Sequence, residues 1–370
     1  MNLANDPTRQ KEQACVATLL QRAGISCPPL RGRLHLDLPF GALDIQCDNE
    51  FAVAELTRTF RHYLHTSRST GAIHALNIQT VGERNWPKLK PCLNVSHSTE
   101  EAEYFRWSDG EAVIIHDSFA LLVPDSPASD ISLLASNRQF TDRKKTTGRL
   151  SHHSDDPEFR IDWSIISDLV KGIYAYRTQT YCLHAALLEN NGKGVLLVGE
   201  SGAGKTTSAL ALARAGFTLM SDDMVFAEVD SQNTVHATGL LMSPNFVGQA
   251  PDRLDDLEQT LEQDVIGKTA VNLEQYQLSL SSRASVKPEL VLLLEKPASR
   301  SDHHLFSEID DSAALAAIMS EIVDPMALPR RLGHLTLASA LTEQARIMRL
   351  VTGRNLADLS TRIEAELEQI

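Results

Sequence analysis

Residues Gly199-Glu200-Ser201-Gly202-Ala203-Gly204-Lys205-Thr206 decide how the centre of this chain folds. They match the phosphate-loop pattern G-x-x-x-x-G-K-[ST] at every fixed position. The apolar run 194–198 before them is typical of a buried strand, and residues 207–215 after them are mostly good helix formers. Strand, loop and helix in this order form the context that the motif requires.

The loop has the composition of an anion-binding site. Its glycines allow successive backbone N–H groups to curl around a phosphate, and the helix that follows adds a partial positive charge. Lys205 can reach the β- and γ-phosphates, and the hydroxyl of Thr206 can bind Mg²⁺. The alternative is a glycine-rich turn that binds nothing. The predicted nucleotide-binding residues are Gly199, Glu200, Ser201, Gly202, Ala203, Gly204, Lys205, Thr206 and Thr207.

Three further residues are candidates for catalysis. Asp222 and Asp223 follow the apolar stretch 217–221, where one carboxylate can bind Mg²⁺ and the other can accept a proton from an attacking hydroxyl. Asp222 is the candidate metal ligand beside Thr206, but the sequence does not decide which aspartate is the base. His184 opens an apolar strand, which a turn at 190–192 joins to the strand before the loop.

Composition excludes several classes of protein. The net charge of −13 argues against a nucleic-acid partner, because binding a phosphate backbone needs a basic surface. No apolar run approaches the length of a membrane span, and the N-terminus lacks an apolar signal region. Five scattered cysteines without C-x-x-C spacing are typical of free thiols in a reducing compartment. We therefore expect a cytoplasmic protein.

The pattern along the chain predicts two domains. Residues 1–140 mix short strands and helices and form a candidate α+β domain for partner or substrate recognition. The polar segment 141–159 is predicted to be a linker, and 160–370 to be the phosphate-loop domain. The C-terminal part of that domain is expected to be helical over 309–323, 337–351 and 355–369, where apolar residues recur three or four apart.

The segment YCLHAALLENNGKGVLLVGESGAGKTTSALALARAGFTLMSDDMVF, residues 181–226, resembles the HPr kinase/phosphorylase superfamily. It is most similar to the looser group of HPr-kinase-related proteins, in which small residues follow the histidine and the strand ends in Ser-Asp-Asp. The resemblance implies a kinase core of the HPr kinase/phosphoenolpyruvate carboxykinase type, with a mixed sheet of α/β or α+β class. It also implies that ATP and Mg²⁺ are the cofactors.

The resemblance implies specific catalytic roles. Lys205 and the loop amides bind the phosphates of ATP, Thr206 and one aspartate hold Mg²⁺, Asp223 or Asp222 acts as base, and His184 lies beside the phosphates. Unlike true HPr kinases, this chain has Thr207 after the loop and no Glu-Ile-Arg-Gly segment. Arg253 and Lys268 are the candidates for an additional cation there.

The leading hypothesis is an ATP-dependent kinase that phosphorylates a hydroxyl on a protein, a peptide or a small molecule. Two alternatives stay open: an NTPase that drives a conformational change, and a nucleotide-binding regulatory module without phosphotransfer. The sequence also leaves open the identity of the acceptor and whether the chain forms a homo-oligomer.

Overall fold

The structure is a computed structural model of the 370-residue chain. It describes the following residues: 16–64, 73–81, 86–90, 93–98, 102–108, 110–115, 119–125, 130–136, 163–242, 245–247, 261–263, 268–271, 273, 278–281, 284–296, 303–324, 327–353 and 355–370. These residues divide between two compact units, Met1–Val170 and Lys171–Ile370. The division falls inside helix α4, Trp163–Arg177. The predicted linker over 141–159 lies outside the described residues, so the boundaries expected from the sequence stay predictions.

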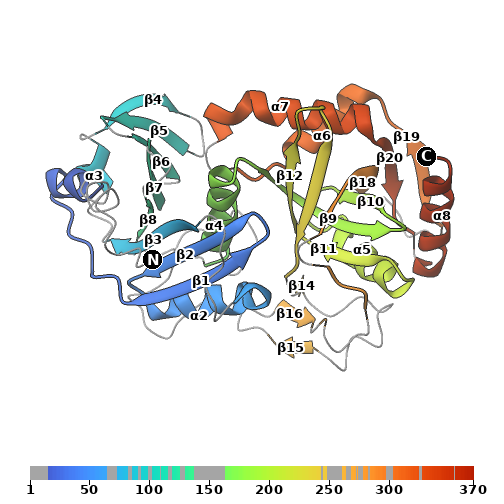
Figure 1. The fold of residues 1–370 in the computed structure, drawn as a ribbon, viewed down its shortest axis with the longest axis horizontal. Helices are drawn as coiled ribbons and strands as arrows, with labels where there is room; N and C mark the ends of the chain where they lie inside the picture. The colour runs from blue at the N-terminus through green and yellow to red at the C-terminus, as the bar shows by residue number, and fades with distance from the viewer. Residues whose placement is uncertain are drawn as a thin grey trace. The chain divides into compact units, whose positions relative to one another are not determined.

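The first unit is built on an eight-stranded mixed sheet with the order β1-β2-β3-β8-β7-β6-β5-β4 (Figure 1). Its strands are β1 Gly32–Leu38, β2 Gly41–Cys47, β3 Ile73–Val81, β4 Asn94–Ser98, β5 Ala102–Trp107, β6 Gly110–Ile115, β7 Phe119–Pro124 and β8 Ile131–Ser136. Its short helices are α2 Glu50–Thr59, the 3-10 turn η2 Arg61–Tyr63 and α3 Trp86–Leu89. Helix α2 packs on β1 and β2, where Ala52 and Leu56, four residues apart, are buried.

The second unit contains a larger mixed sheet with the order β17-β13-β12-β9-β10-β18-β20-β19, and β11 also pairs with β9. Strands β10, β18 and β20 run parallel, whereas the other neighbours are antiparallel. The strands are β9 Tyr181–Asn190, β10 Lys193–Val198, β11 Thr218–Ser221, β12 Met224–Val229, β13 Val235–Leu240, β17 Ser285–Val286, β18 Pro288–Glu295, β19 Leu305–Glu308 and β20 Arg346–Val351. The predicted mixed sheet is therefore confirmed.

Helices cover both faces of this sheet. They are α5 Lys205–Arg214, α6 Asp311–Ser320, α7 Ala327–Gln344 and α8 Leu356–Glu368. Leu197 and Leu292 point into a core shared with α5 and α8, whereas Leu196 and Val291 point into a second core shared with α6 and α7. Because successive residues of a strand face opposite sides, β10 and β18 are apolar on both faces.

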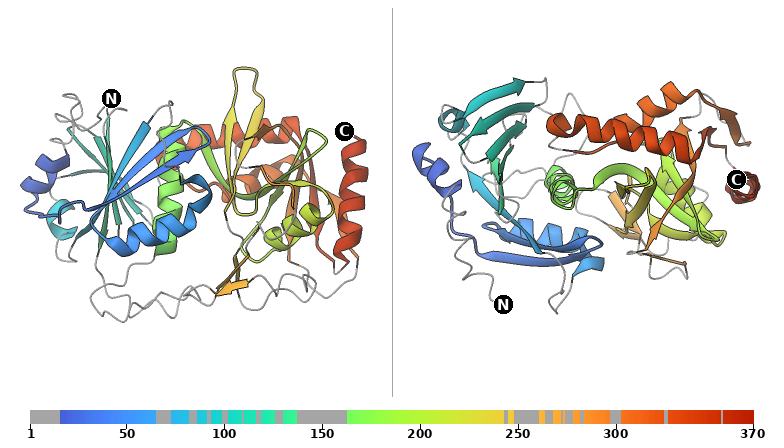
Figure 2. Two further views of the ribbon diagram at one scale, coloured as in Figure 1. Left: turned by 60° about the horizontal axis from the view of Figure 1, so that its bottom comes forward. Right: turned by 45° about the horizontal axis from the view of Figure 1, so that its top comes forward.

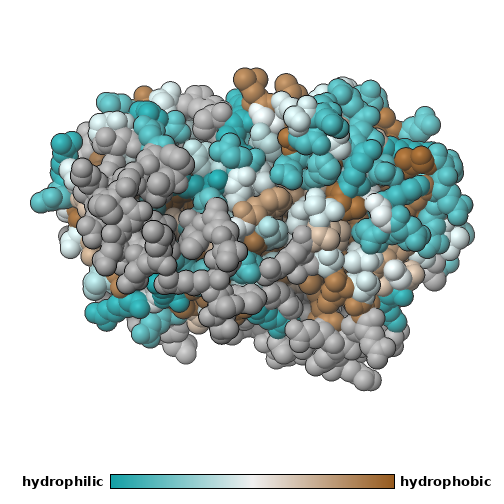
Figure 3. Space-filling model, viewed as in Figure 1, coloured by the Kyte–Doolittle hydropathy of each residue, from teal (hydrophilic) through white to brown (hydrophobic). Residues whose placement is uncertain are grey.

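Two smaller features complete the second unit. Strands β14 Asn245–Val247, β15 Leu261–Gln263 and β16 Lys268–Val271 form a separate three-stranded sheet. The hairpin of β12 and β13, yellow in Figure 2, projects from the main sheet. Hydrophilic side chains predominate around α8 in Figure 3, as expected for a helix whose apolar face is buried.

One expected helix is wrong. Residues 337–351 do not form a single helix, because α7 ends at Gln344 and Arg346–Val351 forms β20, parallel to β18. Met348 and Leu350 alternate with less buried neighbours in this segment, which is the period of a strand. The C-terminal part of the unit is therefore not wholly helical, and β20 belongs to the central sheet.

Candidate nucleotide-binding site

The phosphate loop joins the end of β10 to the start of α5. The β9–β10 hairpin turns through Asn191 and Gly192, which have φ values of 52° and 82°, as a tight two-residue turn requires. Gly204, at φ 102°, is the N-cap of α5, and no side chain caps the helix. The first N–H groups of α5 therefore remain available to an anion.

Lys205 lies over the loop that precedes it. Its side chain is buried, and its Nζ donates hydrogen bonds to the carbonyl oxygens of Gly199 and Glu200, the second at 3.3 Å. Burial lowers the pKa of Lys205, while the charges of Glu321, Asp223 and Asp222 act in the opposite sense. Carboxylates from two distant segments therefore lie close enough to act on this ammonium group.

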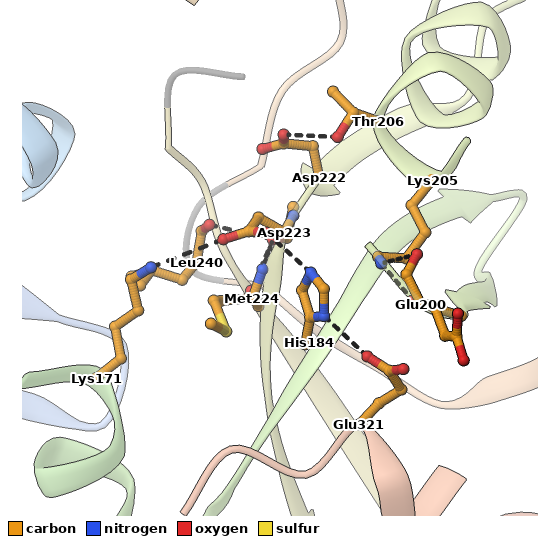
Figure 4. Close-up of polar contacts among 12 residues, drawn as sticks. Lys171, His184, Glu200, Lys205, Thr206, Asp222, Asp223, Met224, Leu240 and Glu321 are labelled. Atoms are coloured by element: carbon orange, nitrogen blue, oxygen red, sulfur yellow. Dashed lines mark hydrogen bonds and ion pairs between the residues drawn. The ribbon is translucent and has the colours of Figure 1, made fainter. Parts of the chain in front are cut away.

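Thr206 and Asp222 form the candidate metal-binding pair. The Thr206 hydroxyl is 3.5 Å from Oδ2 of Asp222, whose side chain is almost completely buried (Figure 4). Oδ1 of Asp222 is buried without a hydrogen-bond partner in the described part of the chain. Burial, and then the neighbouring Asp223, raise the pKa of Asp222 to about 7. A buried carboxylate oxygen without a partner beside a hydroxyl fits a hard cation such as Mg²⁺.

The two aspartates lie where β11 and β12 meet. Both strands pair with β9, with Ser221 opposite Leu187 and Met224 opposite His184. Asp222 and Asp223 occupy the break between these registers. The fully buried hydroxyl of Ser221 accepts a hydrogen bond from the Met224 N–H at 3.0 Å, and this bond stabilises the turn between β11 and β12. Because of this turn, the side chains of Asp222 and Asp223 lie in different surroundings.

His184 lies between two carboxylates. Its Nε2 is 3.4 Å from Oδ1 of Asp223, and its Nδ1 is 2.8 Å from Oε2 of Glu321, at the C-terminal end of α6 (Figure 4). The hydrogen bonds to Asp223 and then Glu321 raise the pKa of His184 to about 9, in spite of burial and the charge of Lys205. The imidazole is therefore protonated at neutral pH and donates to both carboxylates.

Lys171 approaches Asp223 as a second cation. Its side chain is only 3% exposed, and its Nζ is 3.7 Å from Oδ2 of Asp223, which is 43% exposed. Partial desolvation raises the pKa of Asp223, but the hydrogen bond with His184 and the charge of Lys171 outweigh this effect, so the net shift of the pKa is downward. Asp223 therefore stays ionised at neutral pH, whereas Asp222, its neighbour in sequence, is only partly ionised there.

The structure brings the predicted residues together but adds others. His184, Asp222 and Asp223 lie near Lys205 and Thr206 of the predicted loop, and Thr207 lies in the first turn of α5. The sequence did not reveal two contributors, Lys171 and Glu321, and it gave no role to Ser221, which it showed only as part of the Ser-Asp-Asp ending of the strand. A lysine within the apolar run of α4 was a usable signal for the first, whereas nothing local marked Glu321. Of the proposed cations, Lys268 lies in β16 of the small sheet, and Arg253 lies outside the described residues.

Two absences among the described residues concern metal clusters and membrane-spanning helices. Among the described residues, no group of three or more His, Cys, Asp or Glu side chains forms a metal site. Mg²⁺ in phosphate-transfer sites is held by one or two protein ligands together with phosphates and water, so such a cluster is not needed. No described helix has the length and apolar character required to cross a bilayer.

The strand, glycine loop and helix, together with the aspartates facing the loop, define the phosphate-loop class of nucleotide-binding architecture. Comparison with known proteins narrows this class. The family described as SynChlorMet cassette protein ScmC matches residues 153–262. The HPr kinase/phosphorylase of Bacillus pumilus is 36% identical over 78 residues, which are 21% of this chain and 22% of that protein. The corresponding protein of Lachnoclostridium phytofermentans is 29% identical over 84 residues, covering 23% and 27%.

Over the matched part, the chain is similar to proteins of the HPr kinase-like superfamily. It spans only about a quarter of the length of these curated relatives. Among solved structures, the HPr(Ser) kinase/phosphatase of Coxiella burnetii matches with 16% identity and a TM-score of 0.26, covering 51% of this chain and 99% of that one.

Proposed function

We propose that this chain is an ATP-dependent kinase that transfers the γ-phosphate to a hydroxyl group of a protein, peptide or small-molecule acceptor. The observation that carries the proposal is the pair Asp222 and Asp223, which face the phosphate-loop residues from one strand break and have pKa values shifted in opposite directions. Carboxylates whose pKa values are driven apart are typical of sites that need two different roles.

Each residue has a role in this proposal. The amides from Gly199 to Thr206 and the ammonium of Lys205 bind the phosphates, and Thr206 and Asp222 would hold Mg²⁺. Bound Mg²⁺ would neutralise charge on the phosphate oxygens. Asp223, kept ionised by His184 and Lys171, orients the acceptor hydroxyl and accepts its proton. Because phosphoryl transfer depends mostly on positioning, a weakly basic but firmly held carboxylate suits this role.

The proposed acceptor is defined by its hydroxyl group and not as one named molecule. The curated relatives are named as kinases of HPr, so HPr is one candidate acceptor. Thr207 and the absence of a Glu-Ile-Arg-Gly segment distinguish this chain from the pattern of true HPr kinases. For that reason we propose an acceptor other than HPr, and the test includes purified HPr as a separate arm.

The test begins with titration of the wild type and of Lys205→Ala with ATP and GTP, each with and without Mg²⁺. We expect Mg²⁺-dependent ATP binding that the substitution weakens at least about tenfold, because a charge-assisted contact to phosphate is lost. Labelled ATP is then used to search cell extracts and purified HPr for a phosphorylated product.

Asp223→Asn separates the kinase from its two alternatives. In a kinase it abolishes transfer and leaves ATP binding intact, because Asp223 does not hold the phosphates in this proposal. ATP hydrolysis without any labelled acceptor would instead indicate an NTPase. Tight ATP binding with neither transfer nor hydrolysis would indicate a regulatory module, and either result would contradict the proposal.

A further inference from the structure

Three parallel strands end at the same edge of the second sheet. β10, β18 and β20 lie side by side in Figure 1 and run in the same direction. Beyond their carboxyl ends lie the phosphate loop after β10, Lys296 after β18 and Thr352 after β20. In open sheets with parallel strands, ligands bind at this edge.

Lys296 lies directly against the phosphate loop. A Cβ atom added to Gly202 would be 3.5 Å from Cε and 3.8 Å from Nζ of Lys296. Because Gly202 has no side chain and a φ of 81°, the ammonium group approaches the backbone of the loop itself. At the same edge of the sheet, a Cβ added to Gly204 would be 3.6 Å from the hydroxyl oxygen of Thr352.

The positive charges at the carboxyl ends of β10 and β18 favour an anionic ligand. Lys296 and Lys205 are close enough for the charge of Lys296 to act on the ammonium of Lys205, in addition to the larger effect of burial. The carboxylate next to Lys296 in sequence, Glu295, forms an ion pair with Arg349 at 2.9 Å. Two ammonium groups and the uncapped N-terminus of α5 therefore converge on one loop, and a polyphosphate would satisfy all three.

We propose that Lys296 is a second phosphate-binding lysine, which contacts the nucleotide from the β18 side of the loop. The aspartates lie on the other side of β10, beyond β9. Lys296 thus provides an additional cation beside the loop. This inference rests on the proposed nucleotide site and adds a residue that the phosphate-loop motif does not contain.

The test compares Lys296→Gln, Lys296→Arg and the control Lys287→Gln with the wild type. Lys287 is an exposed lysine beside the opposite, amino end of β18. Each protein is titrated with ATP, ADP and adenosine, and its folding is checked by circular dichroism. We expect Lys296→Gln to weaken ATP binding about tenfold, Lys296→Arg to restore most of the affinity, and Lys287→Gln to match the wild type. Adenosine binding should not change.

The outcomes separate the two proposals. If the wild type binds ATP and Lys296→Gln binds it equally well, Lys296 has no role in binding, although the nucleotide site stands. An equal loss for adenosine would also overturn the inference, because adenosine carries no phosphate. If the wild type binds no nucleotide, the proposed function fails and this inference fails with it.

Discussion

Two adjacent carboxylates in this protein behave differently because their side chains leave the strand break in different directions. Asp222 turns into the interior beside Thr206, and its pKa rises to about 7. Asp223 turns toward His184 and Lys171, and its pKa falls. The sequence motif names both residues, but only the surroundings of each side chain assign the roles that we propose for them.

Glu321 positions His184, so its substitution should lower the pKa of the imidazole. We expect Glu321→Gln to shift this pKa from about 9 downward by about 1 unit, because Asp223, the larger influence, remains. The measurement is a pH titration of the His184 ring by NMR. Glu228→Gln, an exposed site on β12, is the matched control. An unchanged titration in Glu321→Gln would show that the contact has no electrostatic effect.

The same contact predicts how stability depends on pH. The folded state binds the His184 proton more tightly than the unfolded state, whose ordinary pKa is 6.5. This contribution is complete below about pH 6.5 and is lost as the pH rises to about 9. Denaturant unfolding across this range should show a smaller loss in Glu321→Gln than in the wild type. A larger loss in the variant would contradict the predicted sign.

At the scale of elements, strand β18 connects the two cores of the second unit. Its residues alternate between the core under α5 and α8 and the core under α6 and α7. It also lies between β10, which leads to the phosphate loop, and β20. The position of the loop therefore depends on how firmly β18 is packed.

Leu292 is fully buried in β18, so Leu292→Ala should lower the free energy of unfolding by about 2–5 kcal/mol. The loss combines the transfer free energy of the removed methyl groups with the cavity that they leave. Chemical denaturation measures it. The control is Leu332→Ala on α7, where the side chain is 82% exposed and we expect a change within about 0.5 kcal/mol. Similar changes at both sites would refute the argument from burial.

At the scale of the whole molecule, the chain has two compact units, each with its own sheet and core. We expect two transitions in calorimetry. ATP with Mg²⁺ at about 100 times its dissociation constant should stabilise one of them by about 2.7 kcal/mol. Leu292→Ala identifies the transition of the second unit, and Leu121→Ala, buried in β7, identifies that of the first. A nucleotide shift confined to the first unit would place the binding site elsewhere.

Local sequence determined the elements that meet at the site. The hairpin, the buried strand β10, the loop and the start of α5 follow from turn residues, apolar runs and glycines that act on their immediate neighbours. The aspartate pair and His184 were recognisable for the same reason. Residues 346–351 were misassigned because short apolar segments suit either a helix or a strand until neighbouring strands decide.

Tertiary structure alone decided which distant side chains complete the site. Glu321 reaches His184 across 137 positions of sequence, and Lys296 reaches the loop because β18 runs parallel to β10. No local pattern encodes such contacts, since they depend on strand order and on where each helix ends. The sequence by itself thus determined the phosphate loop and its acidic partners, and the folded sheet determined the cations and carboxylates that set their charge.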